Sequence, residues 1–212
     1  MLVHDAPNRE NEVDMVVAAE SVGPKHVATM RRDAGGLICV ALHPKIADNF
    51  GLPYLTEVYE KASSYFDVLP YTRPDDLPYD ERSAFSLAVN HRRTFTGITD
   101  NDRALTIREL GKLGAKALND PMIEEFGRNF RSPGHVPLLL AADGMLAERM
   151  GHTELVVALA GLAGITPVIA VCEMLDAGTG KALSLKAASA YASERGLTSL
   201  SGAEIVRAYR GK

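Results

Sequence analysis

The residues with the clearest chemical potential form the run Arg9-Glu10-Asn11-Glu12-Val13-Asp14, directly before an apolar stretch at 15–19. In an extended chain, Glu10, Glu12 and Asp14 would share one face, because side chains repeat every two residues. Three like charges side by side need a cation, a ligand proton or the neighbouring arginine as compensation. The segment therefore predicts a binding site for a metal-bound, oxygen-rich ligand, and the alternative is a solvated acidic loop.

A second polar group, Arg149-Met150-Gly151-His152-Thr153-Glu154, stands at the expected start of a helix. Backbone N–H groups there carry partial positive charge and bind phosphate readily. Arg149 and Thr153 could add hydrogen bonds to such an anion, and the imidazole of His152, which can bind a metal, would lie beside it. The alternative is structural: Thr153 caps the helix, and Glu154 is a favourable acid in its first turn.

Two further candidates adjoin apolar runs. His135 follows Arg131-Ser132-Pro133-Gly134, and this Pro-Gly turn would hold it at the rim of the next strand. An imidazole there can act as a general base near neutral pH, and a rim histidine without a role is the alternative. Glu173 follows the apolar run at 168–172, so it is either a site residue or a solvated strand end.

A third polar loop, Thr96 to Arg103, also leads into an expected helix and is either a phosphate cradle or a turn with a cap. Several familiar motifs are absent from the sequence: the Gly-x-x-x-x-Gly-Lys loop, the dinucleotide fingerprint, His-Glu-x-x-His and the serine nucleophile elbow. Sites for ATP, NAD and a zinc protease therefore lose support.

The elements that must position these residues follow from hydrophobic patterning. Short apolar runs predict five strands, at Met15–Ala19, Gly36–Leu42, Phe85–Val89, Val136–Leu140 and Val168–Cys172. Helices are predicted at Pro24–Asp33, after a cap at Asn101 or Asp102, at Thr153–Ala163, from a cap at Ser184 to Gly196, and after the capping box that opens at Ser201.

Two segments are expected to be irregular. Residues 67–82 contain three prolines among acids and predict a surface loop, with a mobile lid as the alternative, and residues 118–131 are broken by Pro121 and Gly127. Strands and helices do not alternate strictly. The prediction is therefore an α+β fold, a mixed-sheet α/β sandwich with helices packed around it, forming a single domain over residues 1–212.

Composition excludes several classes of partner. The 212 residues are 46% hydrophobic with a net charge of −4, so there is no basic footprint for nucleic acid. No secretory signal stands at Met1, and no apolar segment approaches the roughly 20 residues that span a bilayer. Cys39 and Cys172 lie in apolar runs and are expected to be buried thiols. These features predict a cytoplasmic protein that binds small molecules, without membrane or nucleic-acid partners.

Taken together, the motifs resemble those of the 3,4-dihydroxy-2-butanone 4-phosphate synthase family, enzymes of riboflavin biosynthesis. The proline-rich segment and Ser132 are similar to the archaeal form, although the family usually has a further helix before the first strand, and bacterial members often have a smaller residue at the position of Met150. Several separated motifs in one order are far harder to meet by chance than any one of them. The matching stretches are Asn8–Asp14, Asp33–Cys39, Thr94–Arg103, Arg131–His135, Gly151–Glu154 and Cys172–Glu173.

The resemblance implies conversion of D-ribulose 5-phosphate to L-3,4-dihydroxy-2-butanone 4-phosphate and formate, with Mg²⁺ or Mn²⁺, by a homodimer whose sites lie at the subunit interface. Carried over by motif, Glu10 and His152 would bind the metal, and His135 and Glu173 would be the residues essential to proton transfer. Glu12 and Glu154 would line the same site. The expected substrate contacts are Arg9, Glu10, Asp14, Arg149, Gly151, Thr153 and Glu173.

The implied chemistry is consistent with these side chains. Removing a proton beside a ketone creates enediolate charge, which a divalent ion stabilises, and dehydration, skeletal rearrangement and C–C cleavage then need several acid/base groups. Rival interpretations are another metal-dependent phosphosugar lyase or isomerase and a non-catalytic sugar-phosphate sensor. The helix at 153–163 is apolar around most of its circumference, and a second subunit is expected to bury what one sheet face leaves uncovered.

Overall fold

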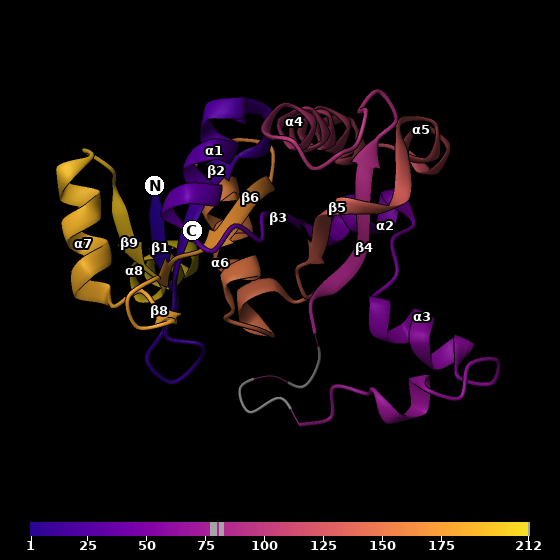
Figure 1. Ribbon diagram of the computed structural model, residues 1–212, viewed down its shortest axis with the longest axis horizontal. Coiled ribbons are helices and arrows are strands. Elements are labelled where there is room, and N and C mark those ends of the chain that lie inside the picture. Colours follow the sequence, from indigo (N-terminus) through magenta and orange to yellow (C-terminus); the bar gives the residue numbers. More distant parts are fainter. Residues whose placement is uncertain (77–79, 81–82, 212) are drawn as a thin grey trace.

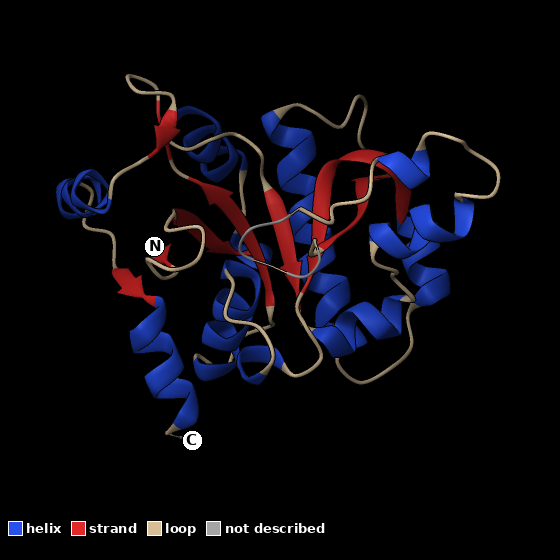
Figure 2. Ribbon diagram, turned by 90° about the horizontal axis from the view of Figure 1, so that it is seen from below, coloured by secondary structure: helices blue, strands red, loops and turns tan. Residues whose placement is uncertain are grey.

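The computed structural model describes residues 1–76, 80 and 83–211, and within them a seven-stranded mixed sheet lies between two layers of helices (Figures 1 and 2). The strand order is β4-β5-β3-β6-β2-β1-β9. The strands are β1 (Leu2–His4), β2 (Val13–Ala18), β3 (Cys39–Leu42), β4 (Phe85–His91), β5 (Phe130–Leu140), β6 (Val168–Glu173) and β9 (Ser199–Ser201). A separate ribbon pairs β7 (Leu175–Asp176) with β8 (Lys181–Ala182).

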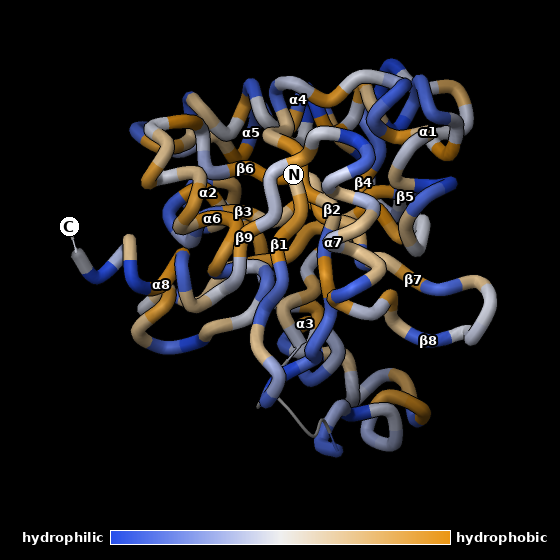
Figure 3. The backbone as a smooth tube through the Cα atoms, turned by 90° about the vertical axis from the view of Figure 1, so that its left-hand side faces the viewer, coloured by the Kyte–Doolittle hydropathy of each residue, from blue (hydrophilic) through white to orange (hydrophobic). Residues whose placement is uncertain are grey.

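The α-helices of the described residues are α1 (Pro24–Asp33), α2 (Pro44–Phe50), α3 (Leu55–Ala62), α4 (Asp100–Ala117), α5 (Ile123–Asn129), α6 (His152–Leu162), α7 (Leu185–Glu194) and α8 (Gly202–Arg210). Short 3-10 turns occur at Ala19–Ser21, Leu69–Tyr71 and Met145–Ala147. Helix α3 and the segment after it project from the main body, whose apolar residues concentrate around the sheet (Figures 1 and 3). None of the described helices has the length and apolarity to cross a membrane.

Alternation along the strands divides the core in two. Val40 and Ala170 face a cluster built with α1, α2 and α4, whereas Cys39 and Val171 face a cluster built with α6 and α8. Both halves are well buried, so each face of the central strands contributes to stability. The site residues described below lie on the α6 face, at the end of the sheet where β2 begins and β6 ends.

The predicted α+β fold with a mixed sheet is confirmed. Each of the five predicted strands is present with shifted ends, and α1 has the predicted bounds. Ser184 and Ser201 are the predicted N-caps of α7 and α8, since their hydroxyls accept the backbone N–H groups of Ala187 and Glu204. The two cysteines are buried free thiols, as expected.

Several predictions were wrong. The acidic segment does not have the extended form in which its three acids would share one face: a turn covers residues 7–10, Asn11 has φ 55°, and β2 begins at Val13, two residues before the predicted strand. The N-cap of α4 is Thr99, not Asn101 or Asp102. The segment from Arg131 to Gly134 belongs to β5 and is not a turn.

Residues 118–131, predicted to be irregular, contain helix α5, because Pro121 precedes the helix and Gly127 is tolerated at an exposed position within it. Of the predicted loop at 67–82, the described residues are irregular apart from one 3-10 turn, and the stretches 77–79 and 81–82 lie outside the described residues.

The apolar circumference of α6 also has a different cause from the one expected. Leu155, Val156 and Val157 are buried within the chain, because α6 packs on the sheet with one side and on α8 with another. Helix α8 therefore covers part of the circumference that was assigned to a second subunit. Leu159 and Leu162 are only partly buried, and the dimer stays a prediction.

Helix α4 passes so close to the 3-10 turn after β2 that Gly111 has no space for a side chain. A Cβ there would lie 2.7 Å from the backbone nitrogen of Glu20. We expect Gly111→Ala to destabilise the protein by about 1–3 kcal/mol, because overpacking outweighs the better helix propensity. Gly127→Ala in α5, where no atom lies within 4 Å, should instead stabilise by about 0.5–1 kcal/mol. Chemical denaturation of both variants tests this, and equal effects would contradict it.

Candidate active site

A cavity of about 310 Å³ lies where β2 begins, β6 ends and α6 starts. It brings together six of the predicted site residues, which come from both ends of the chain. Phe85, Leu139 and Val171 form an apolar part of its wall. The predicted site residues that line it are Glu10, Asp14, Arg149, His152, Thr153 and Glu173.

Strand pairing places two of the carboxylates together. Asp14 on β2 lies directly opposite Glu173 on β6, so both side chains point to the α6 face. Asp14 is only 2% exposed, and its Oδ1 has no hydrogen-bond partner. Burial, reinforced by the neighbouring acids, raises the pKa of Asp14 to about 7, against the opposing effect of His152. A carboxyl group in this state can exchange a proton near neutral pH.

His152 is the cation among these acids. Its Nδ1 lies 3.0 Å from a carboxylate oxygen of Glu10, and its Nε2 lies 3.2 Å from the carbonyl oxygen of Glu12. Both partners can only accept, so both ring nitrogens donate and the ring is an imidazolium. Burial opposes the charge, but the neighbouring carboxylates, Asp14 and Glu10 above all, raise the pKa of His152 to about 9.

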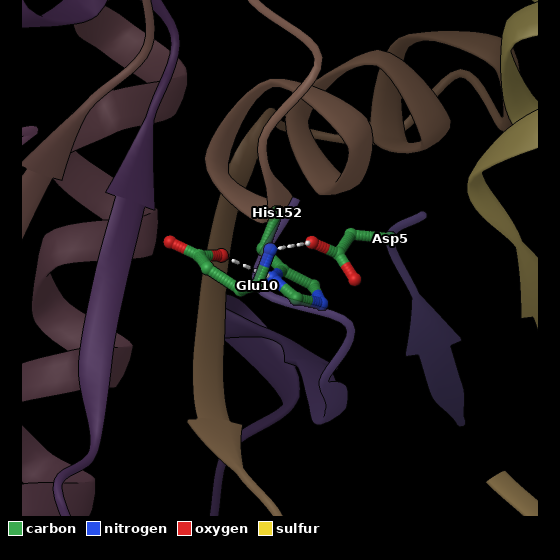
Figure 4. Close-up of side chains that lie close together, drawn as sticks. All are labelled: Asp5, Glu10 and His152. Carbon is green, nitrogen blue, oxygen red and sulfur yellow. Dashed lines mark hydrogen bonds and ion pairs between the residues drawn. The ribbon is translucent and has the colours of Figure 1, made fainter. Parts of the chain in front are cut away.

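Asp5 shapes the acidic segment, although the sequence pattern did not single it out. Its two carboxylate oxygens accept the backbone N–H groups of Glu10 and Glu12, at 3.0 and 3.1 Å. Figure 4 shows Asp5, Glu10 and His152 close together around this turn. This turn, and not an extended chain, brings Glu10 to the imidazole of His152.

The same three residues form a group that could hold a metal ion, with one ligand atom from each lying within 4.8 Å of the others. Carboxylate oxygens suit a hard divalent cation, and neutral imidazole is a common metal ligand. Beside them, the buried Oδ1 of Asp14 accepts no hydrogen bond and has only an ion-pair contact of 3.7 Å with Nε2 of His152, which leaves it able to interact with a further cation. The donor set therefore fits Mg²⁺ or Mn²⁺, provided that His152 gives up one proton.

Two arginines meet at Asp80 beside the cavity, and Arg149 lines its wall whereas Arg9 does not. Arg9 and Arg149 both donate to one carboxylate oxygen of Asp80, at 3.1 and 2.5 Å. Arg149 also donates to Glu154 at 2.7 Å. The pattern of the sequence had marked Asp80 only as a charged loop residue, because nothing local reveals partners about 70 positions away.

The start of α6 differs in part from the structural alternative considered for it. The N-cap is Gly151, so Thr153 is not the cap and its side chain is available to the cavity. Glu154 is fully buried and accepts the N–H groups of Gly151 and Ala142, at 3.2 and 2.9 Å. Glu154 therefore fixes the guanidinium of Arg149 through their ion pair and does not itself line the cavity.

His135 does not join the other predicted residues. It is exposed on β5 and is absent from the cavity wall. The loop at Thr96–Arg103 is a turn and cap, since Asp102 accepts the N–H groups of Thr96 and Gly97. These N–H groups are therefore not free for a phosphate.

The imidazolium should make the stability of the metal-free protein depend on pH. The folded pKa of His152, about 9, exceeds its ordinary 6.5, so its stabilising effect is complete below about pH 6.5 and is lost as the pH rises through 9. We expect the destabilisation by His152→Asn to be larger at about pH 6 than at about pH 9.5, by on the order of 1–3 kcal/mol. Thermal unfolding in EDTA measures this, with exposed His26→Asn as the control. An effect that does not change with pH would contradict the assignment.

Comparisons with known proteins agree with this geometry. Residues 1–208 match the family model for 3,4-dihydroxy-2-butanone 4-phosphate synthase. A synthase of that name from Methanothermobacter thermautotrophicus is 54% identical over 209 residues, which is 99% of this chain and 90% of the relative. The Archaeoglobus fulgidus synthase is 52% identical, with 99% and 88% of the two chains covered.

Solved structures give the same result. A cation-free crystal structure of 3,4-dihydroxy-2-butanone 4-phosphate synthase superposes with a TM-score of 0.78 at 29% identity, covering 100% of this chain and 91% of the other. A structure of a synthase in complex with two magnesium ions has a TM-score of 0.78 at 30% identity, covering 98% and 88%. The chain therefore belongs to the 3,4-dihydroxy-2-butanone 4-phosphate synthase family and is an enzyme of that family.

Proposed function

We propose that this enzyme converts D-ribulose 5-phosphate to L-3,4-dihydroxy-2-butanone 4-phosphate and formate, in riboflavin biosynthesis. The observation that carries the proposal is the convergence of the acidic group around His152 with Arg149 in one cavity, where Arg9 joins Arg149 through their shared partner Asp80. The first can bind a divalent cation and sugar oxygens, and the second can bind a phosphate. The names of the relatives and of the magnesium-bound neighbour support it.

Substrate binding follows from the two sides of the cavity. Arg9 and Arg149 are charged and mostly enclosed, which suits recognition of a phosphate. Thr153 and the N-terminus of α6 at Gly151 lie next to them and can add hydrogen bonds. The substrate contacts that we propose are Arg9, Glu10, Asp14, Arg149, Gly151, Thr153 and Glu173.

Glu10 and His152 would hold Mg²⁺ or Mn²⁺, next to Asp5. When bound, the cation polarises neighbouring sugar oxygens and stabilises negative charge that develops on them. Asp14 and Glu173 then serve as paired acid and base: the pKa of Asp14 near 7 lets it give or take a proton, and Glu173 faces it across the strand pair. Enolisation, dehydration, rearrangement and C–C cleavage each need such a proton transfer.

We further propose a homodimer in which His135 reaches the cavity of a second copy. His135 is exposed and does not line the cavity of its own chain, yet family resemblance assigns it to proton transfer. A residue can satisfy both conditions when the site is shared between two subunits.

The reaction itself is tested by incubating the enzyme with ribulose 5-phosphate and Mg²⁺ and following formate by NMR. We expect formate without added NAD or ATP, and a loss of activity of about a hundredfold or more in Glu173→Gln, because acid/base groups typically contribute this much. Glu124→Gln, on the exposed face of α5, is the matched control. Turnover to an isomeric phosphosugar without formate would favour another lyase or isomerase, and binding without turnover would favour a sensor.

Subunit mixing tests the shared site. Glu10 and His152 contact each other within one chain, so heterodimers of Glu10→Gln with His152→Ala should stay inactive. Heterodimers of Glu10→Gln with His135→Ala should regain one of their two sites, because one cavity then has both residues intact. Recovery in the first mixture, or none in the second, would contradict the arrangement. Sedimentation of the wild type at assay concentration checks for the dimer.

A further inference from the structure

The structure encloses a polar side chain, Asn90 of β4, directly beside His135. Asn90 is 4% exposed and makes its side-chain hydrogen bonds to His135 and to the backbone of Thr96. We infer that Asn90 is a positioning residue that sets which ring nitrogen of His135 carries the proton. The position of the proton follows from the structure alone. Its effect on turnover rests on the proposed catalytic role of His135.

The orientation of the Asn90 amide follows from one contact. Its Oδ1 lies 2.8 Å from the backbone nitrogen of His135. A backbone N–H can only donate, so the atom facing it must be the amide oxygen and not the amide nitrogen. The amide nitrogen Nδ2 is then the atom that lies 3.1 Å from Nδ1 of the imidazole and 3.5 Å from the carbonyl oxygen of Thr96.

The ring state follows from the amide. Nδ2 donates, so Nδ1 of His135 must accept, and the neutral ring carries its proton on Nε2. The alternative bond, from a protonated Nδ1 to Oδ1, would span a longer 3.3 Å and would set Nδ1–H against the amide N–H groups. Nε2–H is therefore the group that His135 offers to a substrate. In this neutral state Nε2–H donates a hydrogen bond, and the general-base role predicted from the sequence would need Nε2 to be unprotonated.

Two glycines hold this arrangement in place. A Cβ at Gly97, which has φ +95°, would lie 2.0 Å from Nδ2 of Asn90, and a Cβ at Gly134 would lie 2.3 Å from the backbone nitrogen of Asn90. The chain can approach Asn90 this closely only because both positions lack side chains. Rotating the amide by 180° would place its N–H groups against the backbone N–H of His135. Among the described contacts, no acceptor would then replace Oδ1 as the partner of that backbone N–H.

Asn90→Asp is the matching substitution, because it keeps an oxygen for the backbone N–H of His135 and replaces the donor beside Nδ1 by an acceptor. We expect ¹⁵N NMR of the ligand-free wild type near pH 8 to show His135 with the proton on Nε2, and the variant to carry a proton on Nδ1. We expect kcat to fall at least about tenfold with KM changed less than about threefold. Asn49→Asp, a half-buried asparagine on α2 that donates to Ala117, should change neither the ring nor the kinetics.

A wild-type ring protonated on Nδ1, or an Asn90→Asp ring in the same state as the wild type, would overturn the inference. The wild-type spectrum alone can do so, even if a variant fails to fold. An Asn90→Asp variant with the altered ring and normal kcat would refute its catalytic importance. If His135→Ala also keeps full activity, the failure lies in the proposed role of His135, while the NMR assignment of the tautomer stands.

Discussion

A surplus of negative charge at one end of the sheet is the constraint that the rest of the fold must accommodate. Asp5, Glu10 and Asp14 lie close to the imidazolium of His152, and Glu173 lies opposite Asp14 on the neighbouring strand. Like charges in partly buried positions oppose folding unless protons or cations neutralise them. The raised pKa of Asp14 and the imidazolium state of His152 are both responses to this surplus. The rest of the fold must be stable enough to hold it, which the two apolar clusters achieve.

Each part of the scaffold contributes one constraint to that arrangement. The antiparallel pair β2 and β6 fixes Asp14 against Glu173, and the burial of α6 by the sheet and α8 fixes the position of its N-terminus. Asp5 folds the acidic segment into a turn by accepting two backbone N–H groups. Rigid elements therefore hold the acids and the imidazole, while the Asp80 contact with the two arginines comes from a loop.

The predictable parts of the structure were those encoded locally. Apolar runs and hydroxyl caps depend on neighbours within a few residues, so the five strands, α1 and the caps at Ser184 and Ser201 were found. Strands β1 and β9 have three residues each, too few for a periodic signal, and form because β1 pairs with both β2 and β9. The roles of Asp5 and Asp80 arise from tertiary contacts, and only the resemblance, not spacing, marked Glu10 and His152 as a pair.

The proton on His152 and a divalent cation are alternatives for the same acids. Two of the carboxylates that raise the pKa of His152, Glu10 and Asp5, are in the group that could hold the metal, and a metal can use the imidazole only after one proton has left. Metal uptake must therefore release a proton, and apparent affinity must rise with pH until His152 is neutral in the metal-free state. A site that tolerates both forms has a positive charge beside its acids whether or not the metal is bound. This explains how a fold can retain so many buried carboxylates when the cation is absent.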